Sequence, residues 1–380
     1  MKIVQLITAF QLGGAEKVAL DIATKMNDAN LKMEFLSIFK AEGDFSDSFK
    51  KILAENDISY REIGFTKQTS KLKYFSLVYS AFFLFLYICK NKIKIVHSHT
   101  DLPDFVLAIT LKLNNLLQRT RFKVVRTIHN TELWPTHLKV GKFTEKSFID
   151  DYVVFISNDV EKAYKKLRAK YDLNESIYQY KILNGVDLNK FKNESYKLEK
   201  LNIHLDNNKI NFLFVGRFVM QKGFDLLIET FDNLDSKYKD KLSLYAFGSG
   251  DLKNMAINKS FIHLYEPITD IYKIYSSFDY LVMPSRFEGL PLVSLEASAS
   301  KLVVIASDAP GLCETIPPNW PLLFKNENIN SFREKIIEAI DNKYDKETLG
   351  NKSFSFIAEH FNIKTTIQRY KTLYLNLEKS

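Results

Sequence analysis

The sequence predicts an α/β protein built of two parallel-sheet domains. Three observations support this fold class: a length of 380 residues, short apolar runs that alternate with longer amphipathic stretches, and a restart of that alternation in the second half. Strands buried on both faces appear as continuous apolar runs, and the helices between them supply the crossovers of a parallel sheet. A chain of this length has room for two cores, because single domains most often contain about 100–150 residues.

Each apolar run is read as a buried strand, because it is rich in β-branched and aromatic residues and is bounded by turn signals. In the first half these runs lie at 2–6, 32–38, 93–97, 123–127 and 152–156. In the second half they lie at 210–215, 242–247, 261–264, 280–283 and 302–306. The longer stretches between them have the length of crossover helices.

A polar segment separates the two halves. Residues 184–208 are rich in Lys and Asn and lack apolar periodicity, which is typical of a linker. We therefore expect an N-terminal domain at 1–183 and a C-terminal domain at 209–358. The last segment, 359–380, has the apolar spacing of a helix.

Two apolar segments have some properties of export or membrane signals. The run after Lys2 is short and is interrupted by Gln5 and Thr8, so we expect a buried first strand there rather than a signal peptide. The stretch 74–89 contains 16 mostly aromatic and aliphatic residues. It falls short of the roughly 20 residues that span a bilayer, and we expect a heavily buried helix.

The composition excludes several classes of protein. With 46% apolar and 26% charged residues, the chain is not a disordered protein, a collagen-like repeat or a disulfide scaffold. Its two cysteines, Cys89 and Cys313, form no CxxC motif and cannot supply the four ligands of a zinc site. A reduced, cytoplasmic setting is the simplest expectation.

The formal net charge of +8 lies entirely in the first half. Residues 1–185 contain 28 basic and 20 acidic residues, whereas residues 186–380 contain 25 of each. Six lysines and no acidic residue lie between positions 63 and 100, on both sides of the apolar stretch. Two interpretations of this positive charge stay open. It contacts an anionic inner-membrane surface peripherally, or it forms a solvated lysine-rich surface without a partner.

Open parallel sheets bind ligands beyond the carboxyl ends of their strands, so the loops there are the candidate sites. After the first strand, Gly13 and Gly14 open a helix where backbone N–H groups can approach an anion. The spaced GxGxxG of a dinucleotide site is absent, which disfavours a dehydrogenase. A tight turn without a ligand is the alternative.

The loop after 210–215 carries two cations. Arg217 leaves the strand and Lys222 enters the next helix, with Gly216 and Gly223 beside them. Two cations at this spacing can converge on one diphosphate. In the alternative, Arg217 pairs with a local carboxylate and Lys222 is solvated.

The loop after 280–283 carries two carboxylates. Pro291 is expected at the first helical position, so Glu288 should lie in the loop and Glu296 about two turns into the helix. One carboxylate can bind sugar hydroxyls and the other a ribose diol, unless both are ordinary capping and helical residues. Backbone N–H groups that can face phosphate oxygens belong to three residues: Gly289, Leu290 and Leu292.

Histidines follow two strands of the first half. His129 comes just after the strand at 123–127, and His97 and His99 lie near the end of the strand at 93–97. A lone histidine at a strand end is more often structural than functional. No group here has the spacing of a helical metal site, and the sequence has no HExxH, Walker A or DxD motif, so no metal is implied.

Six motifs together resemble those of family 4 retaining glycosyltransferases of the GT-B fold. They are GGAEK at 13–17, IHN at 128–130, NGVD at 184–187, GRFVMQKG at 216–223, FGSG at 247–250, and the glutamates 288 and 296 separated by seven residues. They occur in the family's order along nearly the whole chain. The resemblance implies two facing Rossmann-like domains with a cleft between them, and a C-terminal helix at 359–380 that crosses back to the first domain.

The resemblance implies how the donor diphosphate is bound. Arg217 and Lys222 would bind and neutralise it, and Gly14, beside Gly13, would approach it from the other domain. Pro291 stands where many relatives have glycine, which removes one backbone N–H from the phosphate site.

The resemblance also implies how the sugar and the nucleoside are bound. Glu288 would bind hydroxyls of the transferred sugar, and His129 would contact this sugar near the reacting carbon. Glu296 would bind the nucleotide ribose. The segment from Tyr265 to Ile268 would read the base.

The implied activity is retaining transfer of a hexose or N-acetylhexosamine from a nucleotide diphosphate sugar, with UDP as the expected nucleotide. The implied acceptor is a glycan or a lipid-linked glycan in bacterial polysaccharide or lipopolysaccharide biosynthesis, and no metal or other cofactor is expected. A same-fold epimerase or hydrolase and a non-catalytic nucleotide-sugar-binding protein stay open. Nucleic acid is not an expected partner, because no RRM or zinc-finger motif accompanies the basic residues.

Overall fold

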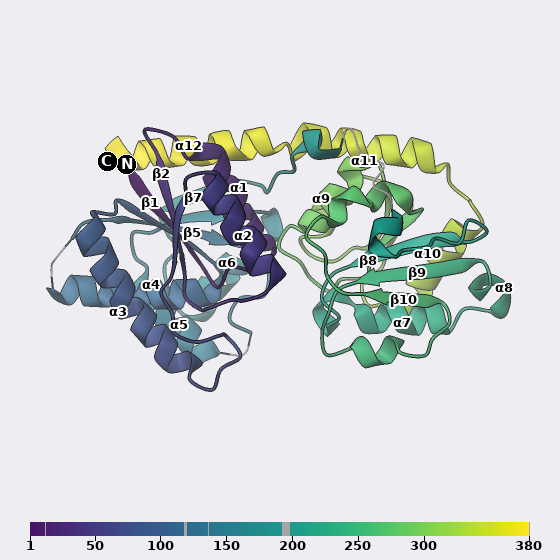
Figure 1. The fold of residues 1–380 in the computed structure, drawn as a ribbon, viewed down its shortest axis with the longest axis horizontal. Helices are drawn as coiled ribbons and strands as arrows, with labels where there is room; N and C mark the ends of the chain where they lie inside the picture. The colour runs from purple at the N-terminus through teal and green to yellow at the C-terminus, as the bar shows by residue number, and fades with distance from the viewer. Residues whose placement is uncertain (12, 118–119, 136, 192–197, 380) are drawn as a thin grey trace. The chain divides into compact units, whose positions relative to one another are not determined.

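The computed structural model describes residues 1–379 except for 12, 118–119, 136 and 192–197 (Figure 1). Internal contacts divide the chain into two units. Unit 1 comprises Met1–Leu183 with Thr365–Ser380, and unit 2 comprises Asn184–Lys364. Leu12 of the first glycine loop, the central part of the expected linker, and Ser380 at the chain end lie outside the described residues.

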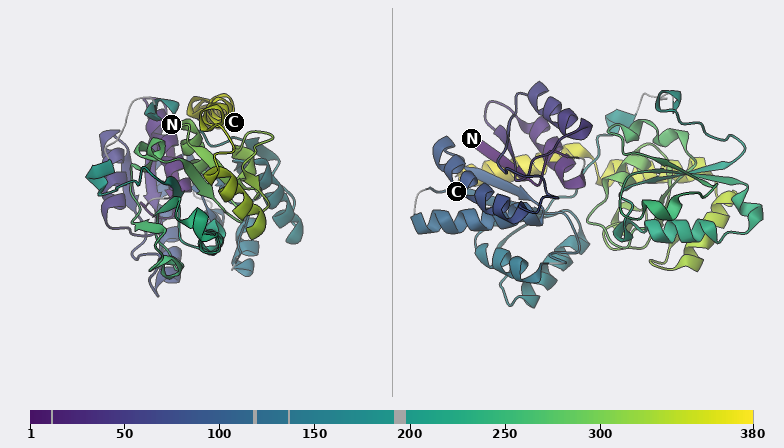
Figure 2. Two further views of the ribbon diagram at one scale, coloured as in Figure 1. Left: turned by 90° about the vertical axis from the view of Figure 1, so that its right-hand side faces the viewer. Right: turned by 60° about the horizontal axis from the view of Figure 1, so that its bottom comes forward.

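Unit 1 is built on a seven-stranded parallel sheet with the strand order β3-β2-β1-β4-β5-β6-β7. The strands are β1 (Lys2–Ile7), β2 (Lys32–Ser37), β3 (Ser59–Glu62), β4 (Ile95–His99), β5 (Lys123–Ile128), β6 (Tyr152–Phe155) and β7 (Tyr178–Lys181). Helices pack on both faces of this sheet (Figures 1 and 2). They are α1 (Gly14–Met26), α2 (Asp44–Glu55), α3 (Lys73–Asn91), α4 (Asp101–Leu117), α5 (Leu138–Ser147), α6 (Asn158–Lys170) and the C-terminal α12 (Ile363–Lys379).

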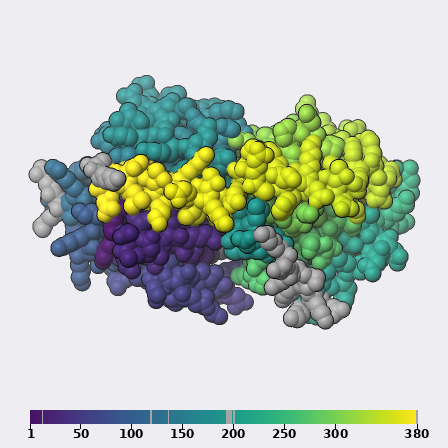
Figure 3. All heavy atoms as spheres, turned by 90° about the horizontal axis from the view of Figure 1, so that it is seen from above, coloured from purple at the N-terminus to yellow at the C-terminus, as the bar shows by residue number. Residues whose placement is uncertain are grey.

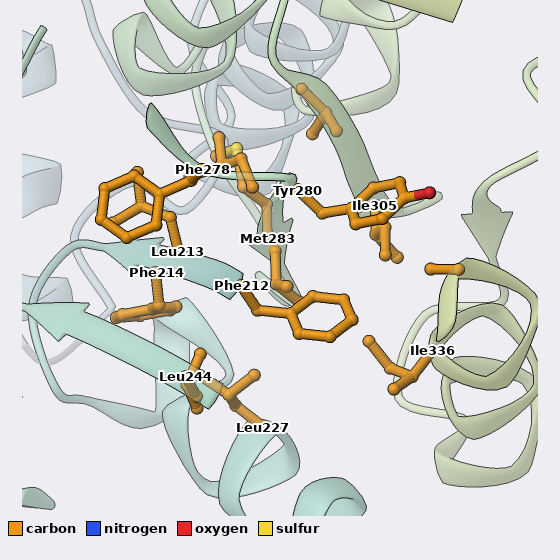
Figure 4. Close-up of a cluster of buried hydrophobic side chains, with 14 of the residues drawn as sticks. Phe212, Leu213, Phe214, Leu227, Leu244, Phe278, Tyr280, Met283, Ile305 and Ile336 are labelled. Atoms are coloured by element: carbon orange, nitrogen blue, oxygen red, sulfur yellow. The ribbon is translucent and has the colours of Figure 1, made fainter. Parts of the chain in front are cut away.

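Unit 2 repeats this architecture with a six-stranded parallel sheet in the order β10-β9-β8-β11-β12-β13. The strands are β8 (Ile210–Val215), β9 (Leu242–Phe247), β10 (Ile262–Tyr265), β11 (Tyr280–Met283), β12 (Val303–Ser307) and β13 (Leu323–Phe324). The helices are α7 (Phe224–Asp232), α8 (Ser236–Lys239), α9 (Leu292–Ala299), α10 (Ile329–Ile340) and α11 (Lys346–His360). Side chains from β8, β11 and the flanking helices meet in one apolar core, which includes Phe212, Leu227, Met283 and Ile336 (Figure 4).

All ten strands expected from the sequence are present, with boundaries that differ by at most two residues. Three strands were not expected: β3, β7 and β13. Each lies at the edge of its sheet, and β3 and β7 contain no buried residue. An edge strand faces solvent and therefore lacks the apolar run that marks a central strand.

The apolar helix α3 is buried on one face only. Leu77 and Leu84 are at most 2% exposed, whereas Phe75 and Phe82 are 72% and 53% exposed. The expectation of a heavily buried helix is therefore wrong. The exposed face could not be predicted from the sequence, because apolar residues occupy both faces of α3 and no polar stripe marks the side in solvent. In the described part of the chain, α3 is the helix whose length and composition would allow it to cross a membrane.

The C-terminal helix α12 brings two fully buried tyrosines into unit 1. The Tyr374 hydroxyl lies 2.6 Å from Nδ1 of His97, and the Tyr370 hydroxyl lies 3.0 Å from Oγ1 of Thr127. From Thr365 onward the helix follows the surface of this unit beside its N-terminal segments (Figure 3).

Candidate active site

The candidate site of unit 2 lies at the carboxyl ends of two central strands. β8 and β11 are neighbours, and the strand order runs outward from them in both directions. α/β proteins bind ligands beyond the strand ends at such a reversal of strand order. The loop after β8 leads to Lys222, and the loop after β11 leads to Glu288.

Lys222 and Glu288 form an ion pair at this reversal. Nζ of Lys222 lies 2.6 Å from Oε1 and 2.8 Å from Oε2 of Glu288. Oγ of Ser285 donates a hydrogen bond to the same Oε1 at 2.7 Å. The Glu288 side chain is 7% exposed and that of Lys222 is 20% exposed. Lys222 is therefore held in place by a buried carboxylate, rather than simply solvated.

Two glycines, Gly223 and Gly311, allow neighbouring loops to pack closely against the loop after β11. Gly223 has a φ of 66°, and a Cβ there would lie 1.8 Å from the carbonyl oxygen of Pro284. Gly311 has a φ of 74°, and a Cβ there would lie 2.2 Å from the carbonyl oxygen of Glu288. Any side chain at either position would push the loops apart. No role was expected for Gly311, although Pro310 and Gly311 form a pair that marks a turn.

Two arginines near the pair have different roles. Arg217 is exposed at the end of β8 and donates to Oε1 of Gln221 at 2.7 Å. Within the described chain no carboxylate pairs with Arg217, so its charge can meet an anionic ligand. Arg286, which the sequence analysis did not single out, forms a bidentate pair with Asp225 at 2.8 and 2.7 Å and ties the β11 loop to α7.

The amino end of α9 offers backbone donors. The helix begins at Leu292, so the expectation of Pro291 at the first helical position is wrong: Pro291 is the N-cap, with φ −72° and ψ 120°. A proline tolerates both places, because its fixed φ suits either and its missing N–H costs no hydrogen bond there. The three expected donors have no hydrogen-bond acceptor among the described residues: the N–H groups of Gly289, Leu290 and Leu292.

Glu296 is the fifth residue of α9, just over one turn into the helix, and not two turns as expected. Its carboxylate is buried and accepts a hydrogen bond from the Tyr275 hydroxyl at 3.2 Å. Tyr275 is fully buried, so this bond fixes the direction of the Glu296 side chain. No local sequence pattern marks Tyr275, because its contact with Glu296 joins residues 21 positions apart.

Tyr265 ends the edge strand β10 and Ile268 follows it, two strands away from β8 in the sheet. The Tyr265 ring stacks on Phe247 with centroids 4.8 Å apart, and its carbonyl accepts from the N–H of Gly248 at 3.0 Å. Ile268 is half-buried against the core of unit 2. No contact in the described chain joins either residue to the Lys222–Glu288 pair.

In unit 1, the two glycines lie at the start of α1. Gly13 is the N-cap and Gly14 is the first helical residue. A Cβ on Gly13 would lie 2.1 Å from Oε2 of Glu16, whereas one on Gly14 would meet no atom within 4 Å. Gly14 therefore presents open space, while the Glu16 carboxyl folds over Gly13. Burial raises the pKa of Glu16 from 4.5 to about 7.

Replacing Glu16 with glutamine is expected to flatten the dependence of stability on pH. A carboxyl whose pKa is higher in the folded protein favours folding below its unfolded pKa of 4.5, and this contribution is lost as the pH rises through about 7. Between those values the wild type should lose stability relative to Glu16→Gln. Denaturant unfolding at pH 5 and pH 8 measures the difference, with Glu55→Gln on the exposed end of α2 as control. Equal pH slopes for all three proteins would contradict this prediction.

His129 belongs to a buried chain of hydrogen bonds in unit 1. Its Nε2 lies 3.0 Å from Nδ1 of His99, and Nε2 of His99 lies 2.8 Å from Oε1 of Gln5. Nε2 of Gln5 donates to the Tyr374 hydroxyl at 3.1 Å. Burial lowers the pKa of His129 to about 3 and holds the pKa of His99 well below its usual range, so both rings are neutral at pH 7.

This chain of hydrogen bonds fixes the tautomers. The amide oxygen of Gln5 can only accept, so Nε2 of His99 carries the proton and its Nδ1 is an acceptor. Nε2 of His129 must then be the donor to His99, which leaves the lone pair of His129 on Nδ1. A structural role was the commoner expectation for His99, and in the structure its ring links His129 to the buried Gln5.

In the described part of the chain, no group of three or more His, Cys, Asp or Glu side chains is arranged to hold a metal ion. In unit 2, the two cations Lys222 and Arg217 and the free N–H groups at the start of α9 suit an organic anion.

The fold is that of GT-B proteins. A solved structure of Alr3699/HepE from Anabaena, in complex with UDP and glucose, matches 99% of this chain and 100% of its own with a TM-score of 0.78 at 17% identity. Residues 195–355 match the family described as glycosyl transferases group 1. The matched segment lies within unit 2.

Curated relatives extend the similarity beyond this segment. An uncharacterized glycosyltransferase of Methanocaldococcus jannaschii is 26% identical over 274 residues, which cover 70% of each chain. The capsular polysaccharide biosynthesis glycosyltransferase CapM of Staphylococcus aureus is 24% identical over 200 residues, which cover 50% of this chain and 52% of CapM.

Proposed function

We propose that this protein is a retaining glycosyltransferase of family 4 that transfers a hexose or N-acetylhexosamine from a nucleotide diphosphate sugar. The donor is UDP-linked, and the acceptor is a glycan or lipid-linked glycan of a bacterial surface polysaccharide or lipopolysaccharide. The reaction requires no metal. The observation that carries the proposal is the Lys222–Glu288 pair at the strand-order reversal of unit 2.

The charges of this site suit the chemistry of glycosyl transfer. Breaking the bond between sugar and phosphate places negative charge on the diphosphate and positive charge on the anomeric carbon. In this proposal Lys222, Arg217 and the free N–H groups at the start of α9 stabilise the leaving diphosphate, and the fixed position of Lys222 against Glu288 supports this role. Glu288 lies against Lys222, where it can accept hydrogen bonds from hydroxyls of the transferred sugar.

The remaining groups suit the sugar and the acceptor. The bare Nδ1 of neutral His129 can accept a hydrogen bond from a sugar hydroxyl. We name no covalent nucleophile: the acceptor attacks from the face that the diphosphate leaves, and the leaving phosphate takes its proton. The bound states of similar structures and the pathway in the name of CapM support a UDP-sugar donor and a polysaccharide product.

Calorimetry with UDP, GDP and ADP tests the donor class. We expect UDP to bind, and Glu296→Ala to weaken it about tenfold or more, because a carboxylate that bonds a ribose diol is lost. Glu334→Ala, on the exposed side of α10, is the matched control. Binding of no nucleotide would overturn the proposal. Turnover of a UDP-sugar without acceptor would favour the epimerase or hydrolase instead.

A further inference from the structure

The outer face of α3 carries a stripe of large apolar side chains. Its five members are 48% to 72% exposed: Phe75, Val78, Tyr79, Phe82 and Leu86. Their spacing of three and four residues places them on one side of the helix. We call this set the α3 stripe. A contiguous apolar face of this kind on a protein surface marks a site of contact with another apolar surface.

The opposite side of α3 anchors the helix in unit 1. Leu77, Ala81, Leu84 and Ile88 are at most 2% exposed and belong to the core of this unit. Taking α3 across a bilayer would pull these side chains out of the core. The helix can therefore meet an apolar phase only with its outer face, while lying along the surface of that phase.

Lysines bracket the α3 stripe at both ends. Lys90 follows Leu86 by four residues and lies on the same exposed side of α3, and Lys71 is exposed two residues before the helix begins. Lys92 and Lys94 follow and are exposed as well. In the described chain none of these four lysines has an ion-pair partner, and positions 63–100 contain no acidic residue.

This charge pattern favours an anionic lipid surface over a second copy of the chain as the partner of the α3 stripe. A second copy docking by α3 in a two-fold arrangement would bring one lysine-bearing end against the other, with no acidic residue between positions 63 and 100 to compensate. An anionic lipid surface offers both complements at once: phosphates for the lysines and an acyl boundary for the stripe. Phe and Tyr side chains are suited to the depth of lipid headgroups.

We propose that the α3 stripe and its flanking lysines form a docking surface for an anionic membrane. Unit 1 binds peripherally, with Phe75 and Phe82 inserted at the headgroup boundary and Lys71, Lys90, Lys92 and Lys94 on lipid phosphates. The docking stands independently of the transfer reaction. We infer that docking holds the protein close to a lipid-linked acceptor, and this purpose rests on the proposed function.

Co-sedimentation of the full chain with vesicles tests this surface. One set of vesicles is phosphatidylcholine alone, and the other contains 30% phosphatidylglycerol. We expect binding to the anionic set at 50 mM NaCl and its loss at 500 mM NaCl. Phe75→Ser with Phe82→Ser should lower the vesicle affinity at least tenfold. Replacement of Lys71, Lys90 and Lys92 by glutamine should lower it by about fivefold per lysine at low salt.

Matched controls separate the surface from general effects. Ile149→Ser with Ile177→Ser removes two side chains of unit 1 that are 76% and 78% exposed. Glutamine at Lys237, Lys239 and Lys241 removes three charges from unit 2. Both control variants should bind like wild type. Nucleotide binding, measured on every variant, reports that unit 2 stays folded and tests the proposed function separately.

Two results would overturn the proposal. One is that the wild type sediments equally with both sets of vesicles, or that Phe75→Ser with Phe82→Ser sediments with the anionic set as strongly as Ile149→Ser with Ile177→Ser. The other is a dimer in analytical ultracentrifugation that Phe75→Ser with Phe82→Ser dissociates, in a protein that ignores vesicles; the stripe would then be an interface between copies.

Discussion

Lys222→Ala is expected to lower kcat/KM for glycosyl transfer by about 10²- to 10³-fold. Preorganised donors aimed at developing negative charge contribute this much when they are removed singly from other enzymes. Lys222 is preorganised here, because both carboxylate oxygens of Glu288 lie within 2.8 Å of its Nζ. Most of the loss should appear in kcat, since the charge on the leaving diphosphate grows as the bond to the sugar breaks.

Steady-state kinetics with a UDP-sugar and an acceptor measure this effect. Lys259→Ala is the matched control, because Lys259 is also ion-paired, with Asp232 at 2.6 Å, but precedes β10 at the amino edge of the sheet. We expect its kcat to equal that of wild type. A thermal melt of each variant separates chemistry from folding. A Lys222→Ala protein that melts like wild type and retains activity within threefold would contradict the assigned role.

Arg126→Met is expected to destabilise unit 1 by about 3–5 kcal/mol at pH 7.5, because removing one partner strands buried charges. The Arg126 side chain is 1% exposed and contacts three carboxylates: Asp104 at 2.8 Å, Glu145 at 2.7 Å and Asp151 at 3.2 Å. Arg168, 3.4 Å from Glu145, is the second cation of the cluster. Methionine fills much of the volume but leaves these carboxylates without their main counter-charge.

The pH dependence identifies the cause of this loss. Burial raises the pKa of Asp104 from 3.8 to about 6 even with Arg126 present. A carboxyl with a raised folded pKa gains stability as the pH falls. Without the arginine the pKa of Asp104 should rise further, so the stability deficit of the variant should shrink between pH 7.5 and pH 5.5.

Tryptophan fluorescence can follow unit 1 alone. The chain has two tryptophans, and Trp134 lies in the cluster, with Nε1 3.4 Å from Oε1 of Glu145. In a Trp320→Phe background, urea unfolding monitored at Trp134 reports on unit 1. Arg121→Met, at an exposed position of the same unit, serves as control. A loss below about 1 kcal/mol, or a deficit that does not change with pH, would refute the explanation.

Strong local signals made the central strands predictable. β8, β9 and β11 have the boundaries expected from their apolar runs, because each is buried on both faces and ends at a turn signal. The edge strands β3 and β7 escaped prediction, since solvent on one side removes that signal, and β13 escaped because it has only two residues.

Part of the candidate site was also predictable. Lys222 and Glu288 could be assigned to loops after strands, and the rule that parallel strands present their carboxyl ends together placed them near one another. Their direct contact, and the carboxylate–hydroxyl bonds from Ser285 and Tyr275, depend on loop conformations that no local pattern encodes.

By itself the sequence determined the fold class, the two-unit organisation and the loops that carry the candidate residues, because these follow from periodicity and turn residues. Tertiary structure alone decided which face of α3 is buried, how His99 and Gln5 set the tautomer of His129, and that Arg126 contacts three carboxylates. Each of those outcomes depends on the packing of residues far apart in the chain, and packing at a distance leaves no trace in a local sequence pattern.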